Sequence, residues 1–187
     1  ILYRLVGSEM CIRDRKDTVN YDQMRYEGFG PNGTSIIVEA LTDNRNRTAS
    51  NVRSAFQKFG GSMGETGSVS HAFNHYGFVR YNKDVTSEED FFNFSIEGGA
   101  EDCFIEEDTY EAVSTPETLS NLYNYLDKKF GEPVSSGVQW KPVTYVAIEG
   151  DKLKSLINLL NELDNDEDVQ QVFSNFEASD EELAKFA

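Results

Sequence analysis

The residues whose types and spacing could do chemistry lie between Thr42 and Arg53, in the run TDNRNRTASNVR. Arg45 and Arg47 stand where a helix is expected to begin, and the positive end of a helix dipole disfavours cations there. A guanidinium offers a planar fork of donors that matches a phosphate, and the free backbone N–H groups of a helix start add donors at the same place. The run therefore predicts contact with the phosphates of a nucleic acid.

A helical wheel extends this prediction along the helix. Apolar side chains at 49, 52, 56 and 59 form one face, and Arg47, Asn51, Ser54 and Lys58 fall on the opposite face, which carries two positive charges and no acid. The alternative is that exposed arginines on a helix are simply solvated, and the sequence leaves that open. The candidate nucleic-acid contacts are Asn44, Arg45, Asn46, Arg47, Asn51, Arg53 and Lys58.

Two motifs are similar to ligand-binding loops but lack essential features. Residues 28–33 match G-x-G-x-x-G, yet a strand-like run follows where a dinucleotide site needs a helix. The acidic run 164–168 opens like a calcium loop, but Val169 replaces the required glycine and Asn175 the required glutamate. A hairpin and a solvated acidic turn are the better interpretations, so no cofactor is expected.

The sequence also lacks the residue patterns of a metal site or a catalytic site. His71 and His75 are the only histidines, and neither has a further His or Cys nearby to complete a zinc site. Cys103 lies in an apolar run, where a free cysteine is usually a small core residue. No nucleophile stands beside a base, so we expect no catalytic residue, no metal and no enzymatic activity. No apolar run approaches the length of a membrane span either, so no membrane partner is expected.

The charge of the chain is unevenly distributed. It has 187 residues, of which 39% are hydrophobic, and a formal net charge of -16. Residues 1–85 hold 11 basic and 9 acidic side chains, whereas residues 86–187 hold 6 and 24. The first half can therefore still present a basic face to phosphates. Within the second half, the hypothesis is a protein-interaction module that works through an acidic insert, residues 83–143, and faces a basic partner, with solubility alone as the alternative. Its acidic residues are Glu101, Asp102, Glu106, Glu107 and Asp108.

Hydrophobic periodicity and turn residues predict an α+β fold, with small sheets each covered on one face by helices. The turn Gly-Pro-Asn-Gly at 30–33 predicts a hairpin. Strands are expected at 24–29, 34–41, 68–81 with a polar turn at 74–77, 102–106, 109–114, 138–148 and 169–173. Helices are expected with caps at Asn46 or Thr48, Thr86, Thr115 and Asp151.

Residues 26–73, YEGFGPNGTSIIVEALTDNRNRTASNVRSAFQKFGGSMGETGSVSHAF, closely resemble the YebC/PmpR family of transcriptional regulators, which includes the mitochondrial translational activator of cytochrome c oxidase. The resemblance continues through IEGGAEDCFIEEDTYEAVSTPE at 96–117 and DVQQVFSNF at 168–176. It implies a non-enzymatic role in gene expression. Members are described as DNA-binding regulators and as ribosome-associated translation factors that bind ribosomal RNA. A cytoplasmic location follows, or the mitochondrial matrix for an organellar homologue.

The resemblance also implies a domain plan of a basic helical bundle followed by two α+β domains, the last inserted into the middle one. We therefore expect two small α/β subdomains of the ferredoxin-like type, 17–82 with 144–176 and an insert at 83–143. An acidic C-terminal tail is expected at 177–187. Residues 1–16 are expected to be a non-native or disordered tail standing where the basic bundle belongs, so the chain is expected to lack much of the family's positive charge.

Overall fold

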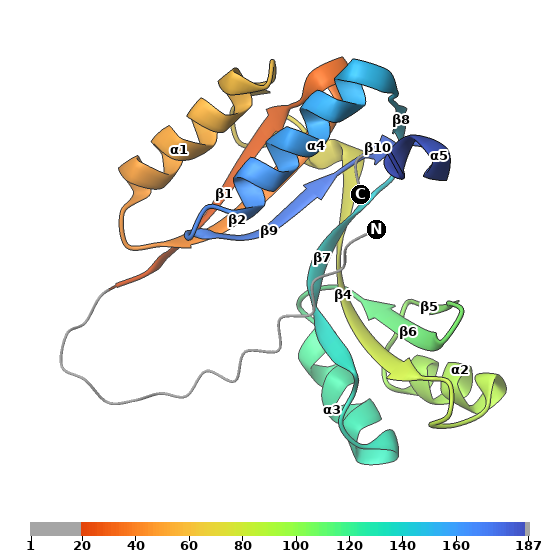
Figure 1. Ribbon diagram of the computed structural model, residues 1–187. Helices are drawn as coiled ribbons and strands as arrows, with labels where there is room; N and C mark the ends of the chain where they lie inside the picture. The colour runs from red at the N-terminus through yellow and green to blue at the C-terminus, as the bar shows by residue number, and fades with distance from the viewer. Residues whose placement is uncertain (1–19, 186–187) are drawn as a thin grey trace. The chain divides into compact units, whose positions relative to one another are not determined.

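The computed structural model describes residues 20–185, and the expected tail at 1–16 lies outside them (Figure 1). The described chain divides into two compact units. The inserted unit comprises residues 75–140, and the split unit comprises 20–74 and 141–185. The chain passes from one unit to the other within two strands, β4 (Phe73–Asn82) and β7 (Ser135–Pro142). The domain bounds expected from the sequence, 82/83 and 143/144, remain a prediction.

A four-stranded antiparallel sheet with the order β3-β1-β2-β9 forms one layer of the split unit. Its strands are β1 (Asp22–Phe29), β2 (Ser35–Thr42), β3 (Ser62–Met63) and β9 (Val169–Ser174). The 3-10 turn η1 (Pro31–Gly33) joins β1 to β2, and Asn32 adopts a positive φ of 64° there. Asparagine tolerates this left-handed conformation, so the expected hairpin is confirmed.

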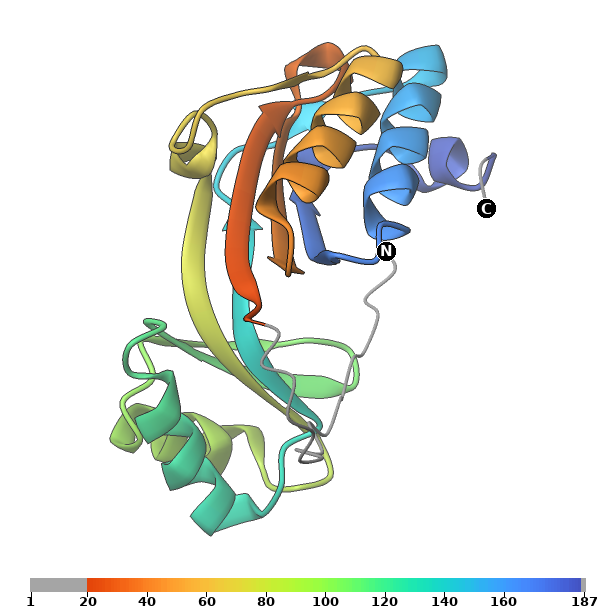
Figure 2. The ribbon, with the colours of Figure 1, turned by 90° about the vertical axis from the view of Figure 1, so that its left-hand side faces the viewer.

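Helices α1 (Arg45–Lys58) and α4 (Gly150–Asp164) cover one face of this sheet and lie beside each other (Figure 2). The apolar stripe of each helix meets the sheet in one core, which includes Val38, Val52, Phe56, Leu153 and Leu156. Burying each of these side chains contributes about 1.5–3 kcal/mol. The remaining elements are the 3-10 turn η2 (Ser70–Ala72), the parallel pair β8 (Val146–Ala147) and β10 (Phe176–Glu177), and the one-turn helix α5 (Asp180–Leu183).

The inserted unit follows a βαββαβ order. Its elements are β4 (Phe73–Asn82), α2 (Glu88–Glu97), β5 (Asp102–Ile105), β6 (Thr109–Ser114), α3 (Leu119–Phe130) and β7 (Ser135–Pro142). The strand order β5-β6-β4-β7 is that of a ferredoxin-like sheet. Helices α2 and α3 pack on it around Phe91, Leu122 and Leu126. The predicted α+β class, with one unit inserted into another, is therefore confirmed.

Some local predictions were wrong. The expected turn at 74–77 is absent, because β4 runs without interruption from Phe73 to Asn82. Helix starts also differ: Asn44 rather than Asn46 or Thr48 caps α1, Ser87 rather than Thr86 caps α2, α3 begins at Leu119 after a turn from Thr115, and Glu149 rather than Asp151 precedes α4. Across residues 20–185, every helix is too short or too polar to cross a membrane.

Candidate nucleic-acid interface

Helix α1 begins at a cap that the local sequence builds. The side-chain Oδ1 of Asn44 accepts a hydrogen bond from the backbone N–H of Arg47 at 3.1 Å, and the N–H of Asn44 donates to Thr42 Oγ1 at 2.9 Å. This cap satisfies one of the free donors of the first turn. Asn44 was predicted to contact nucleic acid, and the structure shows its side chain acting as the helix cap.

Arg45, the first residue of α1, forms a two-point ion pair with Asp22 at the start of β1. Its Nε lies 2.7 Å from Asp22 Oδ2 and its Nη2 lies 2.8 Å from Oδ1. The hydrogen bond from Arg45 lowers the pKa of Asp22 below its usual value. Both side chains remain exposed, so this pair orients Arg45 without burying it.

Arg47 forms ion pairs with two acidic side chains, one of which, Asp168, lies 121 residues away in the sequence. Its Nη2 lies 2.8 Å from both carboxylate oxygens of Asp168 and 2.9 Å from Asp43 Oδ1. Asp168, only 8% exposed, also accepts hydrogen bonds from the hydroxyls of Thr48 at 2.7 Å and Thr42 at 3.2 Å. The hydrogen bonds from Arg47, opposed by burial and helped by those of the threonines, hold the pKa of Asp168 below its usual value. We call these five residues the Asp168 network.

Two further candidates are engaged in the same way. Asn51 donates to Asp166 Oδ2 at 2.9 Å, and Lys58 donates to Glu162 Oε1 at 2.8 Å. The wheel face of Arg47, Asn51 and Lys58 was predicted to carry no acid. That holds for α1 itself, but α4 and the segment after it place acidic side chains against that face. The positive charge of this face is therefore compensated inside the split unit.

A second exposed face of α1 remains. It carries Asn46, Ser50, Arg53 and Gln57, which are spaced by four, three and four residues and so share one stripe of the helix. All four are exposed, and within residues 20–185 none of their side chains has a hydrogen-bond or ion-pair partner. We call them the outer stripe. It offers one cation, two amides and a hydroxyl, with no carboxylate among them.

The structure thus separates the seven predicted contacts. Asn46 and Arg53 lie on the outer stripe, whereas the other five interact with partners inside the split unit. Sequence reasoning missed those acidic partners, of which Asp166 and Asp168 belong to the run considered and rejected as a calcium loop. Their alternating spacing was the available signal, but it did not indicate what they would bind.

The glycine motif, the two histidines and Cys103 are given no functional role by their surroundings in the structure. The glycine motif at 28–33 forms the end of β1 and its turn into β2. His75 stacks on Trp140 with ring centroids 4.1 Å apart, and His71 lies on η2. Cys103 is half-buried, and burial raises the pKa of its thiol. In the part of the chain that the structure describes, no cluster of His, Cys, Asp or Glu is arranged to hold a metal ion.

Comparison with known proteins identifies relatives over most of the chain. The family model described as the TACO1/YebC second and third domain matches residues 21–176. Among solved structures, the crystal structure of a conserved hypothetical protein, Aq1575 from Aquifex aeolicus, is similar with a TM-score of 0.72 and 37% sequence identity. The match covers 86% of this chain and 66% of that protein, so this chain spans less than two thirds of its relative's length.

Proposed function

This chain belongs to the TACO1/YebC family of transcriptional and translational regulators, and from that premise we propose that it is a non-enzymatic, DNA-binding regulator of gene expression. The observation that carries the finer proposal is the outer stripe. Its four polar side chains are exposed on α1 and have no hydrogen-bond or ion-pair partner within residues 20–185, so they are available to contact a nucleic acid.

The chemistry of the stripe fits a short contact. Arg53 can donate to a phosphate or a guanine edge, and the amides of Asn46 and Gln57 can donate to and accept from bases or sugars. The split unit as a whole is acidic, with 9 basic and 16 acidic residues within 20–74 and 141–185. These acids repel phosphates, so a nucleic acid can come close to this unit only near α1. The two units described should therefore bind nucleic acid weakly, with a shallow dependence on salt.

Ribosome association is the second candidate function. The observation that favours it is the acidity of the inserted unit, which holds 14 acidic and 4 basic residues. Such a surface repels protein-free duplex DNA, but its charge complements the basic segments of RNA-binding proteins. In this alternative the outer stripe contacts ribosomal RNA while the inserted unit faces protein.

A titration of the full chain tests both proposals. Binding to a labelled DNA duplex and to ribosomes is measured at several salt concentrations for the wild type, Arg53→Glu and the control Lys154→Glu. Lys154 is an exposed cation of α4 with no ion pair in the described chain, so both variants change the net charge equally. We expect Arg53→Glu to weaken binding about tenfold and to lower the salt slope by about one.

The outcomes separate the alternatives. If Arg53→Glu weakens binding to the DNA duplex and Lys154→Glu does not, the DNA-binding proposal is supported. If Arg53→Glu weakens binding to ribosomes and not to the duplex, the ribosome proposal is supported. Equal losses with Arg53→Glu and Lys154→Glu would reduce the effect to bulk charge and contradict both. Arg47→Glu is unsuitable for this test, because it would place another carboxylate against Asp168.

A further inference from the structure

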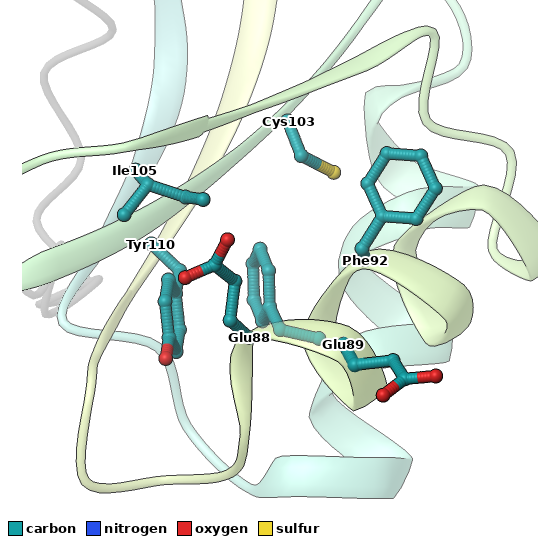
Figure 3. A pocket seen from close by; sticks show the side chains of 7 residues that line it. Glu88, Glu89, Phe92, Cys103, Ile105 and Tyr110 are labelled. Atoms are coloured by element: carbon teal, nitrogen blue, oxygen red, sulfur yellow. The ribbon is translucent and has the colours of Figure 1, made fainter.

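The inserted unit contains an open pocket of about 330 Å³ between the first turn of α2 and the strand β5 (Figure 3). Its walls are apolar, and two carboxylates lie at its rim. In Figure 3, Phe92 and Cys103 face each other across one end, and the side chain of Glu88 extends between Ile105 and Tyr110. The lining residues are Glu88, Glu89, Phe91, Phe92, Cys103, Ile105 and Tyr110.

The pocket follows from how two helices cover four strands. Cys103 and Ile105 pair with Ala112 and Tyr110, so their side chains share the sheet face on which the helices pack. Phe91 fills that layer by stacking on Tyr110, with ring centroids 4.9 Å apart. Phe92 follows about 100° further around the helix and does not fill the layer. Phe92 and Ile105 are each left 50% exposed, so the pocket has two uncovered apolar walls.

Among residues 20–185, the strand beside this pocket has an edge that pairs with no other strand. β5 is the outermost strand of its sheet and pairs with β6. The N–H of Glu106 donates to Thr109 at 2.9 Å, so the alternation of an antiparallel ladder directs the N–H and C=O of Ile105 away from β6. The N–H of Cys103, two residues earlier, donates to Asp102 Oδ1 at 2.8 Å, so Ile105 is the position of this edge at which another extended chain can pair. Backbone donors and acceptors therefore lie next to an apolar pocket.

Charge decides which chain could bind there. Glu88 and Glu89 form no ion pair with any described residue. Exposed acids also lie in and next to β5: Asp102 is its first residue, and Glu101, Glu106, Glu107 and Asp108 adjoin it. Acids beside an edge strand also discourage self-association, which is their ordinary structural role. Of the four cations of this unit, Arg80 pairs with Glu111, Lys129 lies over Phe94, and Lys83 lies over the Tyr110 ring. Lys83 therefore lies beside the pocket, but the seven acids around the pocket and β5 outnumber it, so the net charge there is negative.

We propose that the pocket and the β5 edge bind an extended segment of a partner protein that carries one aromatic or large aliphatic side chain flanked by lysines or arginines. The apolar side chain enters the pocket between Phe92 and Ile105. The flanking cations meet Glu88, Glu89 and the acids beside β5, and the backbone of the segment pairs with Ile105. A second copy of this unit is disfavoured as the occupant, because its own edge is acidic.

The test uses the full chain and a labelled, end-blocked peptide with a central phenylalanine between two lysines. Fluorescence anisotropy measures its affinity for the wild type, Ile105→Ser, Glu88→Gln and the control Glu132→Gln, an exposed acid outside this pocket. Ile105 is half-exposed, so its replacement should leave the unit folded, which circular dichroism checks. We expect Ile105→Ser to weaken binding about tenfold, since it removes an apolar wall against which the anchoring side chain of the peptide packs. Glu88→Gln should weaken it less, and Glu132→Gln should leave it unchanged.

Two matched peptides complete the design. Replacing the phenylalanine by serine should abolish measurable binding, and replacing both lysines by glutamates should do the same. Failure of the phenylalanine peptide to bind the wild type, or equal binding to the wild type and Ile105→Ser, would overturn the proposal. So would a dimer of the free chain in sedimentation that Ile105→Ser dissociates, because the occupant would then be a second copy. None of these outcomes depends on the outer stripe, so the proposal stands or fails separately from nucleic-acid binding.

Discussion

Removing the buried carboxylate of Asp168 from the Asp168 network should destabilise the split unit strongly. In Asp168→Ala, the hydroxyls of Thr42 and Thr48, both fully buried, lose an acceptor at 3.2 and 2.7 Å. A hydrogen bond to a charged group contributes about 1.5–3 kcal/mol. Thr48 keeps a second acceptor in the carbonyl of Asn44 at 3.1 Å, and exposed Arg47 regains water, so the lower part of that range applies to each bond. We expect a loss of about 3 kcal/mol in the free energy of unfolding.

Thermal and urea unfolding of the full chain measure this loss. For a protein of this size, about 3 kcal/mol corresponds to a fall of roughly 10 °C in the Tm of the transition that contains the split unit. Asp43→Ala is the matched control, because Asp43 also pairs with Arg47 but is exposed. A shift with Asp168→Ala no larger than that with Asp43→Ala would refute the claim that this network holds the start of α1.

The same network predicts how stability depends on pH. The folded pKa of Asp168 lies below its ordinary 3.8, so its stabilisation is fully present above pH 3.8 and is lost as the pH falls through the folded value. The difference in unfolding free energy between the wild type and Asp168→Ala should therefore stay constant from neutral pH down to 3.8 and shrink below it. A difference that grows on acidification would contradict this reasoning.

Three further predictions concern other parts of the chain. Gly28→Ala should cost about 1–3 kcal/mol in urea unfolding, because an added Cβ would lie 2.7 Å from the carbonyl oxygen of Ser62, whereas Gly137→Ala meets its nearest atom at 3.5 Å and should be tolerated. Glu27→Ala should lower the midpoint of urea unfolding, because its buried carboxylate accepts from two backbone amides at 2.9 and 3.0 Å, and a midpoint equal to that of wild type would contradict this role. Cys103 should be alkylated by iodoacetamide more slowly in the native chain than in urea, because burial raises its thiol pKa, and peptide mapping with equal rates in both conditions would contradict that.

Periodicity and turn residues predicted most of the elements, because these signals are local. The Gly-Pro-Asn-Gly hairpin and the apolar stripe of α1 are examples. The turn expected at 74–77 shows the limit of such signals. Gly77 lies in the middle of β4, where an added Cβ would lie 2.8 Å from Leu119 Cβ. The glycine is needed for a close approach to α3, which a local pattern cannot reveal.

The site shows the same limit more clearly. Arginines at a helix start break the expected dipole preference, and the sequence offered function as the reason. The structure supplies another cause, because Asp22 and Asp168 lie 23 and 121 residues away from the arginines they pair with. A helical wheel describes one helix, so it cannot include acids from distant segments. Arg53 lies in the middle of α1 and has no acidic partner within residues 20–185, whereas Arg45 and Arg47 do, and the sequence did not show that difference.

The outer stripe as the contact surface for nucleic acid is tested most directly by photo-crosslinking. A photoreactive amino acid is placed at Gln57 on the stripe, or at Lys154 on α4 as the control, and the full chain is irradiated with DNA duplex or with ribosomes. We predict crosslinks to DNA or ribosomal RNA from position 57 and none from position 154. Nucleic-acid crosslinks from position 154 alone, or crosslinks from position 57 to protein alone, would contradict it.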